Sequence, residues 1–273
     1  MKIQTYIVDA FTDKAFSGNP AGVCLLDKNI DIETMQDIAA ELNLSETAFL
    51  ISNNKNHYSI RYFTPTTEVD FCGHATLASS KVILDKLGNE NVNFTTLKEL
   101  ELNATREDGY IKIKFPLYET IDYNPNEALF DAFGIEKSMP TRFSRDLDML
   151  IIEVDNKQAL LDIEPNFQRA IESSQTIKEV VVTTKSDDED YDFYSRCFCP
   201  WIGINEDPVT GASHSVLAKY WGDILQKKEM SAFQLSSRGG FLKLHLISDK
   251  ELEVRSNAQI VFEGEMNLKN KCL

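Results

Sequence analysis

Two short glycine motifs decide the fold: CGHAT at Cys72–Thr76 and TGASH at Thr210–His214. Each follows a strand-like segment, IRYFT at 60–64 and YDFYSRCF at 191–198, after a short turn. Each also opens a stretch whose apolar residues occupy more than one helix face, which is too apolar for a simple surface helix. The same order of features therefore occurs twice. It predicts two similar halves, each a curved sheet wrapped around a central helix.

The spacing of apolar residues predicts the other helices and strands. Asp31 precedes a helical pattern as a plausible N-cap, and Gly134 ends another. The predicted helices cover 31–42, 75–87, 124–133, 165–173 and 212–225. Besides the two strand-like segments before the glycine motifs, the predicted strands include 111–115, 242–246 and 252–254.

The composition is that of a soluble globular chain. The 273 residues fit one large domain or two ordinary ones, and 42% hydrophobic with 26% charged residues argue against disorder. No apolar run approaches the ~20 residues of a spanning helix. The opening MKIQTYIVDAF lacks the pattern of a secretory signal, so a cytoplasmic location is expected, with no membrane partner.

The net charge argues against a nucleic-acid-binding protein, and the cysteines argue against a disulfide-rich or metal-binding one. Lys and Arg total 28 against 43 Asp and Glu, a net charge of −15, which repels the phosphates of nucleic acid. The five cysteines form no CxxC pair and the four histidines are isolated, so neither a disulfide framework nor a metal site is predicted. Cys197 and Cys199 are expected to share one strand face as buried thiols. The acidic run at 185–192 is interpreted as a solvated loop.

The glycine motifs also suggest chemistry. A glycine at a helix start lets the backbone approach a ligand, and the first helical amides attract negative charge. A small carboxylate could bind at Gly73 and Gly211 without any lysine or arginine. Structural capping explains the two turns equally well. Titratable residues lie near them: His74, Asp207 and His214.

Several segments together resemble one known family, the PhzF-like isomerases of phenazine biosynthesis, within the diaminopimelate epimerase-like group. LSETAF at 44–49 is similar to the family's glutamate motif, and VFEGEMNL at 261–268 to its closing strand. The other matching segments are VDAFTDKAFSGNPAGVCLL at 8–26, IRYFTPTTEVDFCGHATLAS at 60–79 and SRCFCPWIGINEDPVTGASH at 195–214.

The resemblance implies an α+β fold of two halves, each a barrel-like β-sheet around a central helix, with the site in the cleft between them. The halves are expected at 1–118, with 260–273 returning to it, and at 119–259. The resemblance also implies a homodimer that acts without metal or organic cofactor. The implied reaction is isomerisation of a small carboxylate by moving a proton.

Carried over by position, the resemblance implies three catalytic residues: Glu46 as the acid/base, supported by His74 and Asp207. Burial against neighbours such as Phe49 is expected to raise the pKa of Glu46 and suit it to proton transfer. The expected substrate contacts are Asn19, Cys72, Gly73, Gly211, Ala212 and Ser213.

Two departures from the family pattern leave alternatives open. The family reads TGSA where this chain has TGAS, so the hydroxyl of Ser213 comes one residue later. Cys72 stands where related racemases and epimerases place a catalytic cysteine, but Thr210 takes the place of their second cysteine. The alternatives are a racemase or epimerase based on Cys72, and a metabolite-binding protein without catalysis.

Overall fold

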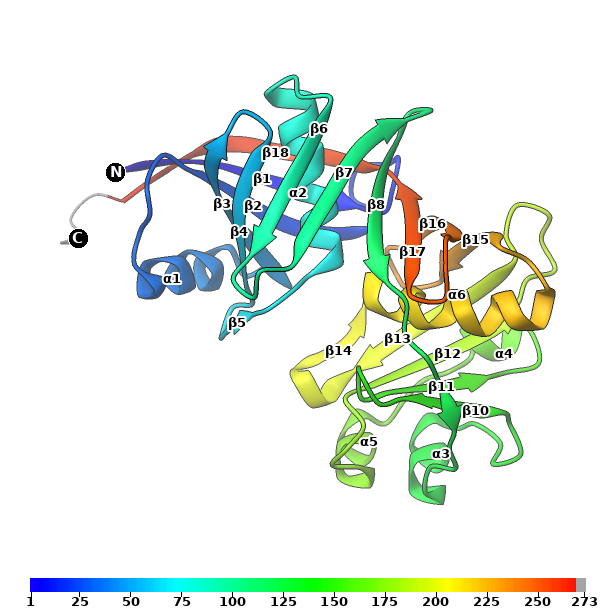
Figure 1. Ribbon diagram of the computed structural model, residues 1–273. Coiled ribbons are helices and arrows are strands. Elements are labelled where there is room, and N and C mark those ends of the chain that lie inside the picture. The colour runs from blue at the N-terminus through cyan, green and yellow to red at the C-terminus, as the bar shows by residue number, and fades with distance from the viewer. Residues whose placement is uncertain (269–273) are drawn as a thin grey trace. The chain divides into compact units, whose positions relative to one another are not determined.

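The computed structural model describes residues 1–268 and divides the chain into two compact units. The first unit comprises Met1–Phe115 and the segment from Glu253 onward, and the second is the continuous stretch Pro116–Leu252 (Figure 1). The second unit is therefore an insertion into the first. The sequence analysis places the boundary at 118/119 and the returning segment at 260–273, of which residues 269–273 lie outside the described part.

The first unit is a sheet with two helices. Its helices are α1 (Ile32–Leu42) and α2 (Gly73–Lys86). Its strands are β1 (Lys2–Ala10), β2 (Asn19–Leu26), β3 (Glu46–Asn54), β4 (His57–Phe63), β5 (Glu68–Val69), β6 (Asn91–Thr96), β7 (Glu101–Glu107), β8 (Tyr110–Pro116), β17 (Glu251–Ser256) and β18 (Ala258–Asn267).

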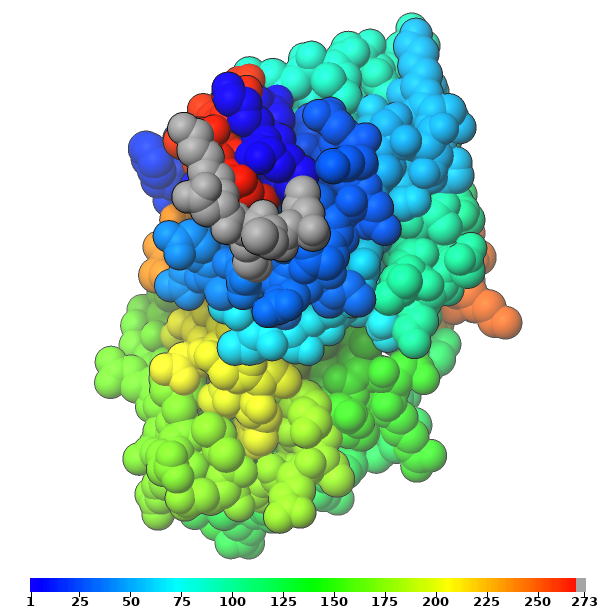
Figure 2. All heavy atoms as spheres, turned by 90° about the vertical axis from the view of Figure 1, so that its left-hand side faces the viewer, coloured from blue at the N-terminus to red at the C-terminus, as the bar shows by residue number. Residues whose placement is uncertain are grey.

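The last strand of the first unit pairs with the first. β18 runs antiparallel to β1 from Ala258, opposite Ala10, to Asn267, opposite Lys2. An ion pair between Lys2 and Glu265, at 2.5 Å, joins their outer ends. The two strands lie side by side in Figure 1, and Figure 2 shows the blue first residues against the red last strand. The sheet of the first unit therefore contains both ends of the described chain.

The central helix α2 packs against strands β1, β2, β3, β6, β7 and β18. Its buried residues run consecutively from His74 to Ser80 and continue at Val82–Leu84, so almost its whole circumference is covered. The second helix, α1, packs against β3 and β4. Met35 and Ile38 of α1 belong to a buried cluster with Cys24, Phe49 and other apolar side chains.

The second unit has more helices. They are α3 (Glu127–Phe133), α4 (Lys157–Leu161), α5 (Phe167–Ser173), the 3-10 turn η1 (Pro200–Ile202) and α6 (Gly211–Leu225). Its strands are β9 (Ile121–Asp122), β10 (Thr141–Ser144), β11 (Met149–Glu153), β12 (Glu179–Lys185), β13 (Phe193–Cys199), β14 (Ile204–Asp207), β15 (Glu229–Gln234) and β16 (Gly240–Leu246).

The two units repeat one topology. In the first, β2–β3 is parallel, β3–β4 and β4–β5 are antiparallel, β4–β6 is parallel and β6–β7 is antiparallel. In the second, the strands β11, β12, β13, β14, β15 and β16 pair in the same sense and the same order. The helix α2 follows β5 as α6 follows β14. The predicted pair of similar α+β halves with central helices is therefore confirmed.

Helix bounds agree with the apolar spacing to within three residues. Asp31 caps α1 as predicted, because its carboxylate accepts from the amide of Thr34 at 2.8 Å. The helix α3 begins later than predicted because Asn126 supplies its N-cap, and Gly134 ends it at a φ of 65°. The short helix α4 has no counterpart among the predictions. No helix in residues 1–268 is long and apolar enough to cross a membrane.

Candidate active site

Glu46 is the first residue of β3, and its surroundings follow from strand alternation. Successive side chains point to opposite faces of a sheet, so Glu46, Ala48 and Leu50 share one face while Phe49 points to the other. Phe49 lies in the cluster beneath α1 and meets the ring of Phe63 edge to face. The expectation that Phe49 packs on Glu46 was therefore wrong. The Glu46 side chain is 16% exposed.

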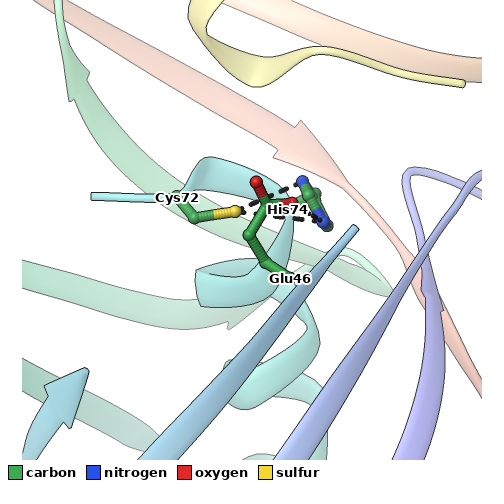
Figure 3. A group of neighbouring side chains, drawn as sticks. All are labelled: Glu46, Cys72 and His74. Carbon is green, nitrogen blue, oxygen red and sulfur yellow. Dashed lines mark hydrogen bonds and ion pairs between the residues drawn. The ribbon is translucent and has the colours of Figure 1, made fainter. Parts of the chain in front are cut away.

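Cys72 and His74 come from the start of α2. Cys72 is the N-cap with an extended backbone, and Gly73 is the first helical residue. Both side chains are buried. The Nε2 atom of His74 lies 3.2 Å from a carboxylate oxygen of Glu46, and its Nδ1 atom lies 3.3 Å from the sulfur of Cys72 (Figure 3). The structure thus brings three of the predicted residues together.

Two further residues complete this cluster. The hydroxyl oxygen of Ser45 lies 3.3 Å from Nε2 of His74 and also within 3.3 Å of the side-chain oxygen of Asn19. Asn19 is fully buried at the start of β2. Asn19 was among the predicted contacts, whereas Ser45 was missed. The sequence could have indicated Ser45, because a hydroxyl directly before Glu46 is a hydrogen-bonding group at the same site.

The charges of the cluster are coupled. Burial opposes a charge on His74, but Cys72 and Glu46 beside it outweigh burial and raise the pKa of His74 well above its ordinary value. Burial also acts against ionisation of Glu46, but His74 outweighs it and the pKa of Glu46 is lowered. The predicted rise in the pKa of Glu46 was therefore wrong. Burial raises the pKa of Cys72, although His74 acts in the other direction.

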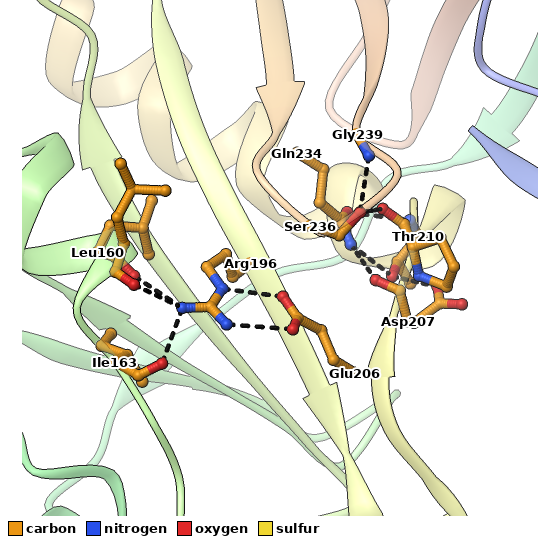
Figure 4. Close-up of polar contacts among 11 residues, drawn as sticks. Leu160, Ile163, Arg196, Glu206, Asp207, Thr210, Gln234, Ser236 and Gly239 are labelled. Carbon is orange, nitrogen blue, oxygen red and sulfur yellow. Dashed lines mark hydrogen bonds and ion pairs between the residues drawn. The ribbon is translucent and has the colours of Figure 1, made fainter. Parts of the chain in front are cut away.

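Asp207 belongs to a separate network in the second unit. It is the last residue of β14, and the hydroxyl of Thr210 donates to its carboxylate (Figure 4). The side chain of Gln234 spans the same turn, because its amide donates to the Asp207 carbonyl at 2.7 Å and its oxygen accepts from the Thr210 amide at 2.9 Å. Gln234 was missed because it lies on β15, far along the chain.

The start of α6 is tied back to Thr210. The hydroxyl of Ser213 donates to the Thr210 carbonyl at 2.9 Å, and Nδ1 of His214 lies 2.7 Å from the same oxygen. Both side chains are fully buried. Neither Thr210 nor Cys72 closes its helix with a side-chain cap hydrogen bond. Substrate contacts at Gly73, Gly211, Ala212 and Ser213 stay predictions.

A guanidinium clamp supports β14. Arg196 donates to both carboxylate oxygens of Glu206, at 2.8 and 3.1 Å, and also to the carbonyls of Leu160 and Ile163 (Figure 4). Two parallel N–H···O bonds fix both distance and orientation. Arg196 thereby fixes the strand that carries Asp207.

Comparison with known proteins identifies the family of this chain. The model of the phenazine biosynthesis-like protein family matches residues 8–264. The chain is 45% identical over 255 residues to an uncharacterized isomerase of Halalkalibacterium halodurans, covering 92% of this chain and 93% of that protein. It is 40% identical over 287 residues to the human phenazine biosynthesis-like domain-containing protein, covering 97% and 99%.

Solved structures agree. A PhzF family protein of Enterococcus faecalis superimposes with a TM-score of 0.88 at 36% identity, covering 98% of this chain and all of that one. A hydroxyproline epimerase of Agrobacterium vitis shares the fold with a TM-score of 0.62 at 14% identity, covering 99% and 94%. The fold is thus that of a class of proteins that includes PhzF family members and this hydroxyproline epimerase. Within this class the chain belongs to the phenazine biosynthesis-like PhzF family, and it is an isomerase.

Proposed function

We propose that this isomerase moves a proton on a small carboxylate metabolite without a cofactor, with Glu46 as the acid/base. The observation that carries the proposal is the contact between Glu46 and His74 in a buried setting. His74 keeps Glu46 ionised, so Glu46 starts as a base. It would take a proton from one carbon of the substrate and return it to another.

Glu46 is a weak base, so proton removal requires that the resulting charge on the substrate is stabilised. A carboxylate with a lowered pKa removes a carbon-bound proton only if the charge left behind is stabilised. The protonated His74 and the amides at the start of α2 are suitable donors for a developing enolate oxygen. Removing one such donor costs about 10²–10³ in kcat in other enzymes. We assign His74 this role.

The other predicted residues complete the proposal. Helix N-termini bind carboxylates, which supports Gly73, Gly211 and Ala212 as substrate contacts. Asn19, Cys72, Ser213 and Asp207 are proposed to hold the substrate in place. We further propose that the enzyme is a cytoplasmic homodimer.

The proposal is tested by Glu46→Gln in a proton-exchange assay. A panel of small carboxylates is incubated with enzyme in deuterated water, and exchange at carbon is followed by NMR. The wild type is expected to exchange one C–H position, and Glu46→Gln to slow exchange by roughly 10³-fold, since general-base catalysis contributes about 10²–10⁴. The matched control is Glu41→Gln on the exposed face of α1, which should exchange like the wild type.

Two outcomes contradict the proposal. Undiminished exchange by Glu46→Gln, with the variant folded, removes Glu46 from the chemistry. Binding of a carboxylate without exchange by the wild type favours the non-catalytic metabolite-binding alternative.

One observation favours a second candidate, a racemase or epimerase based on Cys72. The sulfur of Cys72 lies 3.3 Å from His74, which is a suitable partner for a thiolate. The raised pKa of Cys72 argues against it, because a protonated thiol is not a base. In the same exchange assay, retained turnover by Cys72→Ser rejects this candidate.

A further inference from the structure

Gln234 is a fully buried glutamine whose side chain bonds to the turn before α6. It is the last residue of β15 and is 0% exposed. Its Oε1 atom accepts from the Thr210 amide at 2.9 Å, and its Nε2 atom donates to the Asp207 carbonyl at 2.7 Å (Figure 4). Nε2 also lies 3.3 Å from the Thr210 hydroxyl oxygen. One side chain therefore holds both ends of the turn between β14 and α6.

These contacts fix the direction in which the Thr210 hydroxyl donates. A backbone amide only donates and a backbone carbonyl only accepts, so the amide group of Gln234 cannot be reversed. Its Nε2 atom therefore donates to the Thr210 hydroxyl oxygen. The single hydrogen of that hydroxyl goes to the Asp207 carboxylate. The hydrogen bonds thus form a chain that runs from Gln234 through Thr210 to Asp207.

The first unit carries threonine instead of glutamine at the equivalent position. Thr96 is the last residue of β6, and it forms the last pair of the parallel ladder with Ile60 of β4. Gln234 forms the last pair of the corresponding ladder with Ser195 of β13. The hydroxyl of Thr96 accepts from the Leu100 amide, within its own turn. The contacts of Gln234 are therefore not a requirement of the repeated topology.

We propose that Gln234 is a positioning residue of this isomerase. Through the Thr210 hydroxyl it holds the Asp207 carboxylate in one orientation. Through the Thr210 amide it fixes the start of α6, and with it the amides of Gly211 and Ala212. Asp207, Gly211 and Ala212 are substrate contacts in the proposed function, so the inference rests on that function. Gln234 acts through them and does not itself touch the substrate.

Two substitutions separate the contacts of Gln234. Gln234→Met keeps the length of the side chain and removes every hydrogen bond. Gln234→Glu keeps an acceptor for the Thr210 amide, but a carboxylate cannot donate to the Asp207 carbonyl. In the deuterium-exchange assay, Gln234→Met should raise KM roughly 10-fold to 100-fold and change kcat by less than about 3-fold, because misplaced contacts weaken substrate binding while Glu46 is unchanged.

The matched control is Gln36→Met in the first unit. The side chain of Gln36 also donates to a backbone carbonyl, that of Thr64, at 2.8 Å. The control therefore removes a glutamine–carbonyl bond of similar length that lies outside the proposed contacts. Gln36→Met should keep the kcat and KM of the wild type.

The pH dependence distinguishes positioning from packing. The carboxyl group introduced by Gln234→Glu is buried, so it takes up a proton at higher pH than an exposed carboxyl group does. Once protonated, it can donate again to the Asp207 carbonyl or to the Thr210 hydroxyl. Relative to the wild type, the KM of Gln234→Glu should therefore fall between about pH 8.5 and about pH 6. The KM of Gln234→Met relative to the wild type should stay constant over the same range.

The outcomes separate the role of Gln234 from the proposed function. A wild-type KM in folded Gln234→Met, or an equal rise in Gln36→Met, overturns the positioning role while the role of Glu46 stands. A ratio of KM values for Gln234→Glu that does not depend on pH also overturns it, and this variant alone decides if Gln234→Met does not fold.

If no carboxylate exchanges with the wild type, the proposed function fails and carboxylate binding tests Gln234. Binding of the same carboxylates is then measured by calorimetry, and exchange of the Thr210 amide hydrogen by NMR. Weaker binding by Gln234→Met, together with roughly 10-fold faster exchange of the Thr210 amide, supports the positioning role. Unchanged binding, or no binding by the wild type, overturns it.

Discussion

At the scale of single residues, the state of Glu46 is decided by competition between burial and pairing. Burial alone disfavours a charged carboxylate, whereas a neighbouring cation favours it. His74 lies 3.2 Å away, and its own pKa is raised by Cys72 and by Glu46. The two charges therefore keep each other ionised inside the fold.

His214 carries a pH-dependence of stability. Burial lowers its pKa to about 4 from an ordinary 6.5, although the Thr210 carbonyl acts in the other direction. Its Nε2 has no hydrogen-bond partner in the described part of the chain. As pH falls from 6.5 to about 4, His214 becomes protonated in the unfolded state but stays neutral in the folded state. Stability should therefore fall by about 3 kcal/mol from this residue.

The measurement is urea unfolding at pH 7 and pH 4.5 for the wild type and His214→Asn. Asparagine keeps a donor for the Thr210 carbonyl but does not titrate. The variant should lose less stability on acidification than the wild type. Equal losses in the two proteins would show that His214 does not contribute.

The sequence identified most residues of the cluster but not their contacts. Glu46, Cys72, His74 and Asn19 were each found from their motifs. Their mutual distances depend on β3 pairing beside β2 and on the placement of α2, which no local pattern contains. For the same reason the pKa of Glu46 was predicted with the wrong sign. Strand parity places Phe49 on the opposite face, and His74 is the real neighbour.

At the scale of elements, the two central helices start in the same way. Counting from Gly73 and Gly211, Thr76 and His214 take the same position. The hydroxyl of Thr76 donates to the Cys72 carbonyl at 2.7 Å, just as His214 bonds the Thr210 carbonyl. The contact of His214 with the Thr210 carbonyl is thus explained by its position in the first turn of the helix. Of the two histidines in the glycine motifs, only His74 contacts an acid/base residue.

The turn between β1 and β2 depends on Gly18. Its φ is +68°, and an added Cβ would lie 2.1 Å from the backbone oxygen of Ala10. Gly18→Ala should therefore destabilise the protein by about 3 kcal/mol, from left-handed strain plus a backbone clash. Gly109 is the control, because its φ is +83° but an added Cβ meets nothing. Gly109→Ala should cost only about 1–2 kcal/mol.

Thermal unfolding of the two alanine variants checks this difference. A loss for Gly18→Ala no larger than that for Gly109→Ala would contradict the proposed clash. Because Gly18 precedes Asn19, the variant should also disturb the contact between Asn19 and Ser45.

Elements with strong periodicity were predictable, and short ones were not. The alternation of Ile111, Ile113 and Phe115 matches the buried positions of β8. The helix α4 has five residues, too few for a helical period to show. The pairing of β11 with β12 is parallel and spans two short helices, so it too left no local signal.

At the scale of the whole molecule, the first and last described residues are neighbours. The amide of Leu268 donates to the Met1 carbonyl at 2.9 Å, and the Met1 amino group donates to the Leu268 carbonyl at 3.1 Å. A circular permutant that joins Leu268 to Met1 by a short linker should therefore fold. Opening the chain in the exposed acidic loop, between Asp188 and Glu189, should change the free energy of unfolding by less than about 2 kcal/mol.

The matched control is a permutant opened between Val181 and Val182, inside the buried strand β12. It should fail to fold. Circular dichroism and urea unfolding distinguish the two. Loss of folding in the loop permutant would show that the join at the ends is not tolerated.

The duplication was visible in the sequence because the glycine motifs repeat. The insertion of one unit into the other was suggested only by the family's closing strand, since β18 itself carries no signal for its partner. All but one of its residues are half-exposed or exposed, and the pairing with β1 spans nearly the whole chain. Contacts between residues so distant in sequence are not specified by local preference.

The late arrival of β18 affects how the protein is made. On the ribosome, β1 emerges first and can pair with β2, but it lacks its other neighbour, β18, while Pro116–Leu252 is synthesised. At ~5–20 residues per second, that delay is on the order of ten seconds. The continuous second unit can collapse during this time, whereas the first unit waits for its last strand. The half that carries Glu46 thus begins first and is completed last, with one edge of β1 unpaired in the interval.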